Sequence, residues 1–271
     1  MWTTIEYILI AYLIITAAAF IFQRRLMYHP VKSIAEPAIY GLTTVDEVFL
    51  ASSDGTKLQT WTHAPRAGFP TILYFHGNAF HLADRAVKFS GFVDAGFGLV
   101  AVSYRGFGKS EGRPSEYGIY NDARAAIAYA IDKMNIAPDK LIYFGESLGT
   151  GVAIQMACDL PPALLVLEAA YTSVETRSAE LYPYLLFARK MVRDKYYSLA
   201  KISHIKSPLL MFHGEKDAII PIRHGRELFA AANEPKTFVV YPDVHHTDYT
   251  NEQLLVPLLD AARKYGLINP N

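Results

Sequence analysis

Short, almost wholly apolar segments alternate along most of the chain with longer segments of mixed polarity. The apolar segments are rich in Val, Ile, Leu and aromatic residues and lie at 71–75, 98–104, 140–144, 164–170, 208–212 and 237–241. Between several of them the pattern is typical of helices, at 85–95, 120–134 and 225–233. Continuous apolar strands that alternate with helices indicate a parallel sheet covered on both faces. The pattern therefore predicts a doubly wound α/β domain.

Two strands of a different kind precede this region. Residues 45–51 and 56–64 read as strands on either side of a turn at Asp54 and Gly55, which predicts a hairpin. Before the hairpin, residues 29–41 are rich in Pro and Ala, and we expect an extended linker there.

The first part of the chain is a single long apolar segment. From Trp2 to Phe22 it contains about 21 residues, or about 31 Å as a helix, which matches the hydrocarbon core of a bilayer. No Lys or Arg precedes it, and the Ala17–Ala19 triplet is followed by more apolar residues, so a cleaved signal peptide fits poorly. A helix buried in a soluble protein is the other alternative. We favour a membrane anchor at residues 1–26, with Ile5 to Phe22 in the lipid.

Positive charges follow this segment at Arg24, Arg25 and Lys32. The positive-inside rule then places the rest of the chain on the cytoplasmic side of a single-pass membrane protein. We expect residues 27–271 to form one domain, and a chain lacking residues 1–26 to be soluble and active.

The overall charge and the cysteine content exclude other classes of protein. Lys and Arg number 26, as do Asp and Glu, so the chain lacks the net positive charge of a nucleic-acid-binding protein. Cys158 is the only cysteine, which excludes an internal disulfide, and we expect it to be buried in a helix.

One motif indicates chemistry. Residues 145–149 read Gly-Glu-Ser-Leu-Gly, a G-x-S-x-G sequence directly after an apolar strand and before a predicted helix. In this context the glycines permit a sharp turn that exposes the serine hydroxyl above the sheet. The motif predicts that Ser147 is a nucleophile.

A serine nucleophile needs a histidine base and an acid that orients the base. Asp217 and His246 follow the last two predicted strands, in the chain order expected after Ser147. Glu215 is a rival for the acid and His245 for the base, and the distance from the strand does not separate the two histidines. We expect His213, at a strand end, to be structural.

A hydrolase of this kind also stabilises an oxyanion with two backbone N–H groups. The residue after the nucleophile, Leu148, supplies one of them. The other is expected from the loop after the strand at 71–75, where Gly77 lets the backbone approach closely and Asn78, or alternatively Ala79, presents its N–H.

A long connection separates two of the buried strands. Residues 174–206 are expected to form a small helical cap, because long connections in compact domains usually carry function; a plain surface crossover is the alternative. Its large apolar and aromatic residues fit an acyl chain, and they are Tyr182, Tyr184, Leu185, Leu186, Phe187, Tyr196 and Tyr197.

Residues 40–268 resemble the α/β-hydrolase superfamily, and most closely its bud-emergence-type group. The segments that carry the resemblance are HGNAF, SYRGFGKSEGRPSE, FGESLGTGVAI, HGEKDAIIP and PDVHHTD. The resemblance implies an α/β-hydrolase fold, an N-terminal membrane anchor in many members, and protein depalmitoylases within the group. The group's catalytic histidine lies in a G-H-N-D sequence, which corresponds here to residues 245–248 and favours His246. Phe80 replaces a common glycine and is expected to narrow the acyl pocket.

Together these features predict a serine hydrolase that cleaves carboxylic esters or thioesters through an acyl-enzyme on Ser147. No metal site or phosphate-binding loop is recognisable in the sequence, and the proposed chemistry needs neither a metal nor a cofactor. The alternatives are a serine peptidase on the same fold and a membrane-anchored scaffold without activity.

Overall fold

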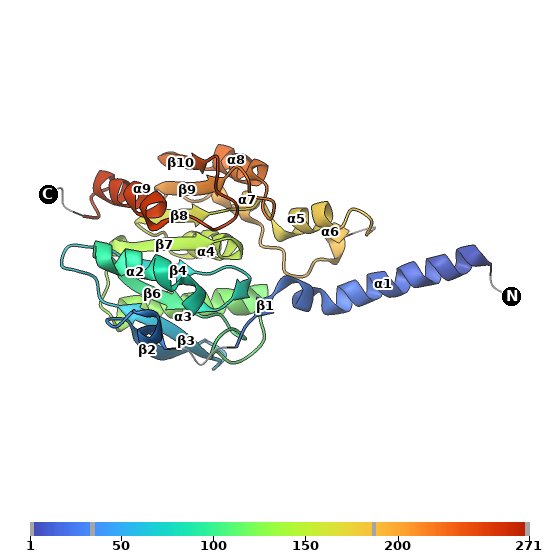
Figure 1. Ribbon diagram of the computed structural model, residues 1–271, viewed down its shortest axis with the longest axis horizontal. Coiled ribbons are helices and arrows are strands. Elements are labelled where there is room, and N and C mark those ends of the chain that lie inside the picture. The colour runs from blue at the N-terminus through green and yellow to red at the C-terminus, as the bar shows by residue number, and fades with distance from the viewer. Residues whose placement is uncertain (1–2, 33–35, 186–187, 269–271) are drawn as a thin grey trace.

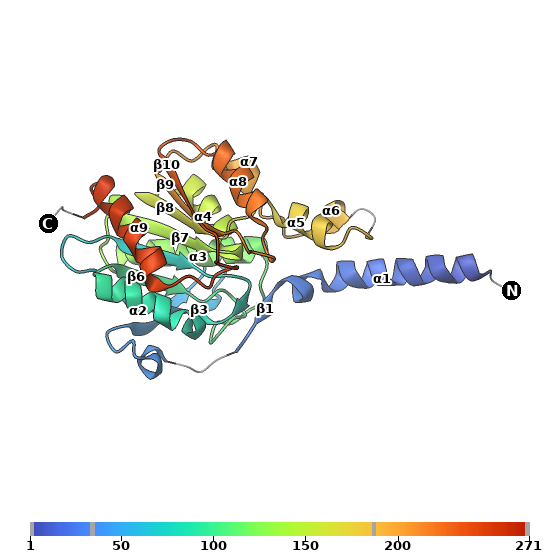
Figure 2. The same ribbon diagram turned by 45° about the horizontal axis from the view of Figure 1, so that its top comes forward.

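The computed structural model describes residues 3–32, 36–185 and 188–268. Trp2, Leu186 and Phe187, three residues of the predicted anchor and cap, lie outside the described residues. A long helix, α1 (Thr4–Met27), projects from an α/β body, and two short helices, α5 (Val174–Leu181) and α6 (Ala188–Met191), lie beside it (Figures 1 and 2).

The body is built on an eight-stranded sheet in the order β10-β9-β8-β7-β4-β6-β3-β2. The antiparallel hairpin of β2 and β3 and the parallel pairing from β6 to β10 are as the sequence predicts. The hairpin joins the parallel strands through antiparallel pairing of β3 with β6. The strands are β2 (Asp46–Ala51), β3 (Lys57–His63), β4 (Thr71–Phe75), β6 (Gly98–Val102), β7 (Leu141–Glu146), β8 (Leu164–Glu168), β9 (Leu209–Gly214) and β10 (Lys236–Tyr241).

Helices cover both faces of the sheet because side chains of its central strands point alternately to either side. In β4, Leu73 and Phe75 join the core on one face, whereas Ile72 and Tyr74 join the core on the other. The first core is closed by α3 (Glu116–Asp132), α4 (Leu148–Asp159), α7 (Ser198–Ile202) and α8 (Ile222–Ala231), and the second by α2 (Ala86–Ala95) and α9 (Asn251–Lys264).

Several elements differ from the sequence prediction. Helix α3 begins four residues before the predicted start, because the Ser115 hydroxyl accepts the N–H of Gly118 and caps its first turn. Part of the expected linker forms strand β1 (His29–Pro30), which pairs with β5 (Ala79–Phe80). Short 3-10 helices occur at η1 (Pro37–Tyr40), η2 (Leu82–Arg85) and η3 (Pro138–Lys140).

The expectation for Cys158 is wrong, since its side chain is exposed on α4. It lies near the C-terminal end of the helix, whereas the residues that face the sheet, such as Val152 and Met156, are fully buried.

Helix α1 is long and apolar enough to cross a membrane. Thr3 and Glu6 form a capping box at its start, and Arg24 and Arg25 lie in its last turn, where cations favour the negative end of the helix dipole. None of its residues is buried in the described structure. Beyond the helix the chain enters the body at once, because Tyr28 is buried and His29 begins β1.

Candidate active site

Ser147 lies in the sharp turn between β7 and α4. Its backbone has φ 52° and ψ −116°, a strained conformation for a residue with a side chain. The flanking glycines make the turn feasible. A Cβ added to Gly145 would lie 2.6 Å from the carbonyl oxygen of Gly149. A Cβ added to Gly149 would lie 1.9 Å from the carbonyl oxygen of Phe75. The packing of β4, β7 and α4 therefore holds Ser147 in this turn.

The structure brings the three predicted site residues together. Ser147 Oγ lies 2.8 Å from Nε2 of His246, and Nδ1 of the same ring lies 2.7 Å from Oδ2 of Asp217. Since a carboxylate accepts hydrogen bonds, Nδ1 carries the proton and Nε2 is free to accept one from the serine. This is the arrangement in which a serine hydroxyl is activated by general base catalysis.

Asp217 is held in place by the backbone that follows it. Its Oδ1 accepts the N–H groups of Ile219 at 2.9 Å and Ile220 at 2.7 Å, which leaves Oδ2 for the histidine. The rival Glu215 is exposed and contacts Arg226 instead.

The rival base is also placed elsewhere. His245 is exposed, and its backbone N–H donates to the Asp248 carboxylate at 3.0 Å. The geometry of the site therefore distinguishes between two adjacent histidines that spacing along the chain leaves equivalent.

Two other histidines are buried beside the site. His213 donates from Nε2 to the carbonyl of Ile220 at 2.8 Å, which is a structural contact as expected. His76 donates from Nδ1 to the carbonyl of Gly77, and its Nε2 accepts the N–H of Tyr104 at 3.2 Å. Burial, reinforced by the nearby Arg85, lowers the pKa of His76 to about 3, so this ring is neutral and fixes the loop after β4.

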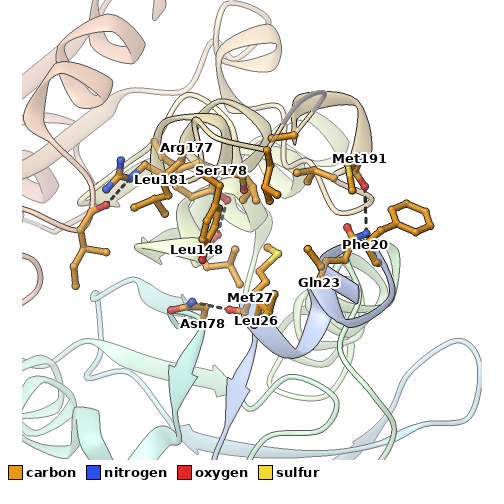
Figure 3. A pocket seen from close by; sticks show the side chains of 18 of the residues that line it. Phe20, Gln23, Leu26, Met27, Asn78, Leu148, Arg177, Ser178, Leu181 and Met191 are labelled. Atoms are coloured by element: carbon orange, nitrogen blue, oxygen red, sulfur yellow. Dashed lines mark hydrogen bonds between the residues drawn. The ribbon is translucent and has the colours of Figure 1, made fainter. Parts of the chain in front are cut away.

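The two expected oxyanion donors lie in the same cavity as Ser147. Leu148 is the first residue of α4, where backbone N–H groups have no partner within the helix. Asn78 directly precedes β5, and its side chain donates to the carbonyl of Met27 at 2.7 Å, which ties this loop to the end of α1 (Figure 3).

The cavity above Ser147 has a volume of about 390 Å³, within the range of small-molecule sites. Its lining is largely apolar and comes from three sources: the end of the sheet, the cap and, unexpectedly, α1 (Figure 3). Of the aromatic cap residues, Tyr182 and Tyr184 line it, whereas Tyr196 is buried in the body beside Tyr28.

Phe80 is not in this lining, so the expectation that it narrows the acyl pocket is wrong. Its ring is exposed on β5. Its φ of 70° lies in the left-handed region, which explains why a glycine suits this position.

A buried cluster of charged side chains next to the serine turn was not predicted. Arg85 contacts the Glu146 carboxylate at 2.6 Å, and Lys88 bridges Glu146 at 3.0 Å and Glu168 at 2.7 Å. The carbonyl of Glu168 accepts the N–H of Ser147 at 2.8 Å. The cluster thus supports the strained turn. The only signal in the sequence is that Lys88, Glu146 and Glu168 interrupt otherwise apolar segments.

The charges in this cluster balance one another. Burial by itself would raise the pKa of Glu146, but Arg85 and Lys88 lower it well below its usual range. Burial raises the pKa of Glu168 against the opposing effect of Lys88.

Comparison with known proteins places this fold and site in context. The sequence profile of a family described as "Serine aminopeptidase, S33" matches residues 69–200. The alpha/beta hydrolase domain-containing protein WAV2 of Arabidopsis thaliana is 32% identical, over 84% of this chain and 82% of its own length. The lysophosphatidylserine lipase ABHD12 of Danio rerio is 29% identical, over 75% of this chain and 63% of its own length.

Solved structures share the same architecture. The esterase Pf2001 of Pyrococcus furiosus superposes with a TM-score of 0.67 at 17% identity, covering 89% of this chain and 97% of that one. The chain therefore belongs to the α/β-hydrolase superfamily, and it is similar to members described as esterases and lipases.

Proposed function

We propose that this protein is a membrane-anchored serine hydrolase that cleaves carboxylic esters or thioesters of acyl chains. The observation that carries the proposal is the series of contacts Ser147–His246–Asp217 at the base of an apolar cavity. The base is within hydrogen-bonding distance of both the nucleophile and the orienting acid, which is the geometric requirement for acyl transfer.

In the proposed first step, Ser147 Oγ attacks the carbonyl carbon of the ester and its proton passes to Nε2 of His246. The resulting oxyanion is stabilised by the N–H groups of Leu148 and Asn78, each typically worth about 3 kcal/mol in the transition state. When the bond to the leaving group breaks, His246 returns the proton to the leaving alcohol or thiol. Asp217 stabilises the imidazolium that exists between these two transfers.

In the second step, His246 takes a proton from a water molecule, and the resulting nucleophile attacks the acyl-enzyme. Collapse of this intermediate releases the carboxylic acid and returns the proton to Ser147. All proton transfers are thus completed by groups present in the chain and by water.

We further propose that residues 1–26 anchor the protein and that residues 27–271 form the catalytic domain, with a cap insertion at about 174–206. The length and composition of α1 support the anchor. Arg24, Arg25 and Lys32 support a cytoplasmic catalytic domain. The similarity to a lysophosphatidylserine lipase supports a substrate with an acyl chain.

The nucleophile is tested with the full chain in detergent. We expect Ser147→Ala to lose labelling by a fluorophosphonate probe and to lower hydrolysis of p-nitrophenyl esters by at least about 10³-fold. We expect His246→Ala to lose a comparable amount, whereas its neighbour variant His245→Ala retains most of the activity. Full activity in Ser147→Ala would refute the mechanism.

A peptidase is the second candidate, favoured by the description of the matched family as a serine aminopeptidase. The two activities use the same three side chains and differ in the leaving group. Comparing turnover of a p-nitrophenyl ester with that of an aminoacyl p-nitroanilide separates them. A wild-type chain that fails to react with either substrate or with the fluorophosphonate would instead favour the inactive scaffold.

A further inference from the structure

Helix α1 contributes to the cavity that contains Ser147. Ile15, Ala19 and Leu26 line the cavity from one face of the helix, with Phe20 and Met27 beside them. On the opposite side stand cap residues of the same apolar character, including Leu181, Leu185 and Met191 (Figure 3). The cavity therefore lies between a candidate membrane span and the cap.

Specific polar contacts hold α1 against the cap. Arg24 forms a two-pronged ion pair with Asp194, at 2.8 and 2.9 Å, and the carboxylate is almost fully buried. The side chain of the preceding residue, Gln23, donates to the carbonyl of Met191 and accepts the N–H of Arg193 at 2.7 Å. These contacts make the wall a fixed part of the cavity.

The cap also follows α1 toward its N-terminal end. The Tyr12 hydroxyl donates to the carbonyl of Tyr184 at 3.1 Å. Tyr12 precedes Arg24 by about 18 Å along the helix axis. If Arg24 marks the membrane surface, Tyr184 lies at the depth of the acyl chains.

The composition of the cap fits this depth. Residues 181–185 carry no charge, and Leu181 and Tyr184 are 50% and 65% exposed. Exposed apolar clusters mark sites of contact with a membrane or a partner. After this segment, where the chain returns to the level of Gln23, basic residues follow at Arg189, Lys190 and Arg193, as expected near lipid head groups. Arg177, before the segment, instead donates to the carbonyls of Ala218 and Ile219 in the body.

We infer that the groove between α1 and the cap binds the acyl chain of a membrane lipid ester, which enters from the bilayer. The inference rests on the proposed function and names its substrate class. The groove runs along α1 from Met27, near Ser147, to Ile15, which lies within the span. A lipid chain therefore reaches the serine without crossing water, and α1 is a binding element as well as an anchor.

A matched pair of substitutions on α1 tests the groove. Ala19→Trp fills it, whereas Ala17→Trp places the same ring on the far, exposed side of the helix. We expect the ratio of kcat/KM for p-nitrophenyl palmitate to that for p-nitrophenyl butyrate to fall at least tenfold in Ala19→Trp and to stay at the wild-type value in Ala17→Trp. Equal ratios in the two variants would refute the inference.

A second readout does not need turnover. In Ser147→Ala reconstituted in lipid nanodiscs, a long-chain fatty acid carrying a diazirine should crosslink to residues 15–26 of α1, and Ala19→Trp should reduce the yield. Crosslinking without any esterase activity in the wild type would contradict the proposed function alone. Absence of crosslinks to α1 would overturn the inference alone.

The depth of the cap is tested with a fluorescent label. In a Cys158→Ser background, a label on Tyr184→Cys should be quenched by lipids with a quencher on their acyl chains. A label on Val87→Cys, an exposed position on α2, should be unaffected. Equal and weak quenching at the two positions would place the cap in water and overturn entry from the bilayer.

Discussion

At the scale of single residues, the turn at Ser147 depends on side chains that take no part in the proposed chemistry. Lys88 is the centre of this support, because its ammonium group contacts both Glu146 and Glu168. It also lies within 3.2 Å of the Tyr74 hydroxyl, which in turn bonds to Glu146. Removal of one member of such a buried network leaves an unpaired charge in a medium that solvates it poorly.

We therefore predict that Lys88→Met lowers the free energy of unfolding by about 3–5 kcal/mol. Lys206→Met is the matched control, because Lys206 is exposed and such changes usually stay within about 0.5 kcal/mol. Urea unfolding of the two variants in detergent measures the difference. Equal stability would mean that the cluster contributes nothing to the turn.

The sequence predicts the residues of the site better than it predicts the buried charged side chains that hold the Ser147 turn in place. Ser147, Asp217 and His246 could be named because chain order and strand ends restrict the choice, although only the structure separates His246 from His245. The partners of Glu146 could not be named, because Arg85 at the end of η2 and Lys88 in α2 reach it from a part of the chain about 60 residues away. Long-range pairing of charges leaves no local periodicity.

At the scale of elements, we propose two roles for helix α1, membrane anchoring and acyl-chain binding, and its sequence pattern does not separate them. Its apolar composition predicts an anchor equally well whether or not one face lines a cavity. The central strands β4, β6, β7, β8 and β9 were predictable because both of their faces are buried. Helix α9 was missed, although it has a capping box at Thr250 and Gln253, because Pro257 interrupts the pattern.

We predict that the Arg24–Asp194 pair controls the docking of α1 on the cap. Among the residues that the structure describes, Arg24→Ala leaves the Asp194 carboxylate with only the Tyr28 hydroxyl as a hydrogen-bond partner. The segment around Arg189 should then loosen, and trypsin should cleave there several-fold faster than in the wild type. Arg25→Ala, which removes a neighbouring charge without breaking this pair, should cleave at the wild-type rate; the same acceleration in both variants would argue against it.

The cavity wall also changes the expectation for a chain that lacks residues 1–26. Such a chain retains Ser147, His246 and Asp217, so it should hydrolyse short esters. It loses the side of the groove formed by α1 and exposes the cap residues that face it. We therefore expect a chain without residues 1–26 to differ from the full chain in its groove as well as in the loss of the anchor.

At the scale of the whole molecule, buried neutral histidines make the stability of the fold sensitive to acid. The pKa of His76 is lowered to about 3, whereas in the unfolded chain a histidine titrates near 6.5. The unfolded state therefore binds the additional proton first, and stability decreases as the pH falls from about 6.5 toward 3.

We predict that the free energy of unfolding falls between pH 7 and pH 5 by about 2 kcal/mol more in the wild type than in His76→Gln. The variant has no imidazole at this position to protonate. Its free energy of unfolding should therefore change less with pH, even if the variant is less stable at every pH. Urea titrations at the two pH values measure the slopes. Parallel curves would mean that His76 does not account for the acid sensitivity.

The direct passage from α1 into the body, with Tyr28 buried and His29 already in a strand, has one more consequence. A flexible tether would let the domain move through a hemisphere of aqueous solution whose radius grows with the square root of the tether length. Here that radius is close to zero. With α1 in a bilayer, the domain stands at a fixed height and meets new molecules only as they drift past in the plane of the membrane. Its encounter rate is then set by the number of molecules per unit of membrane area, and not by their concentration in solution.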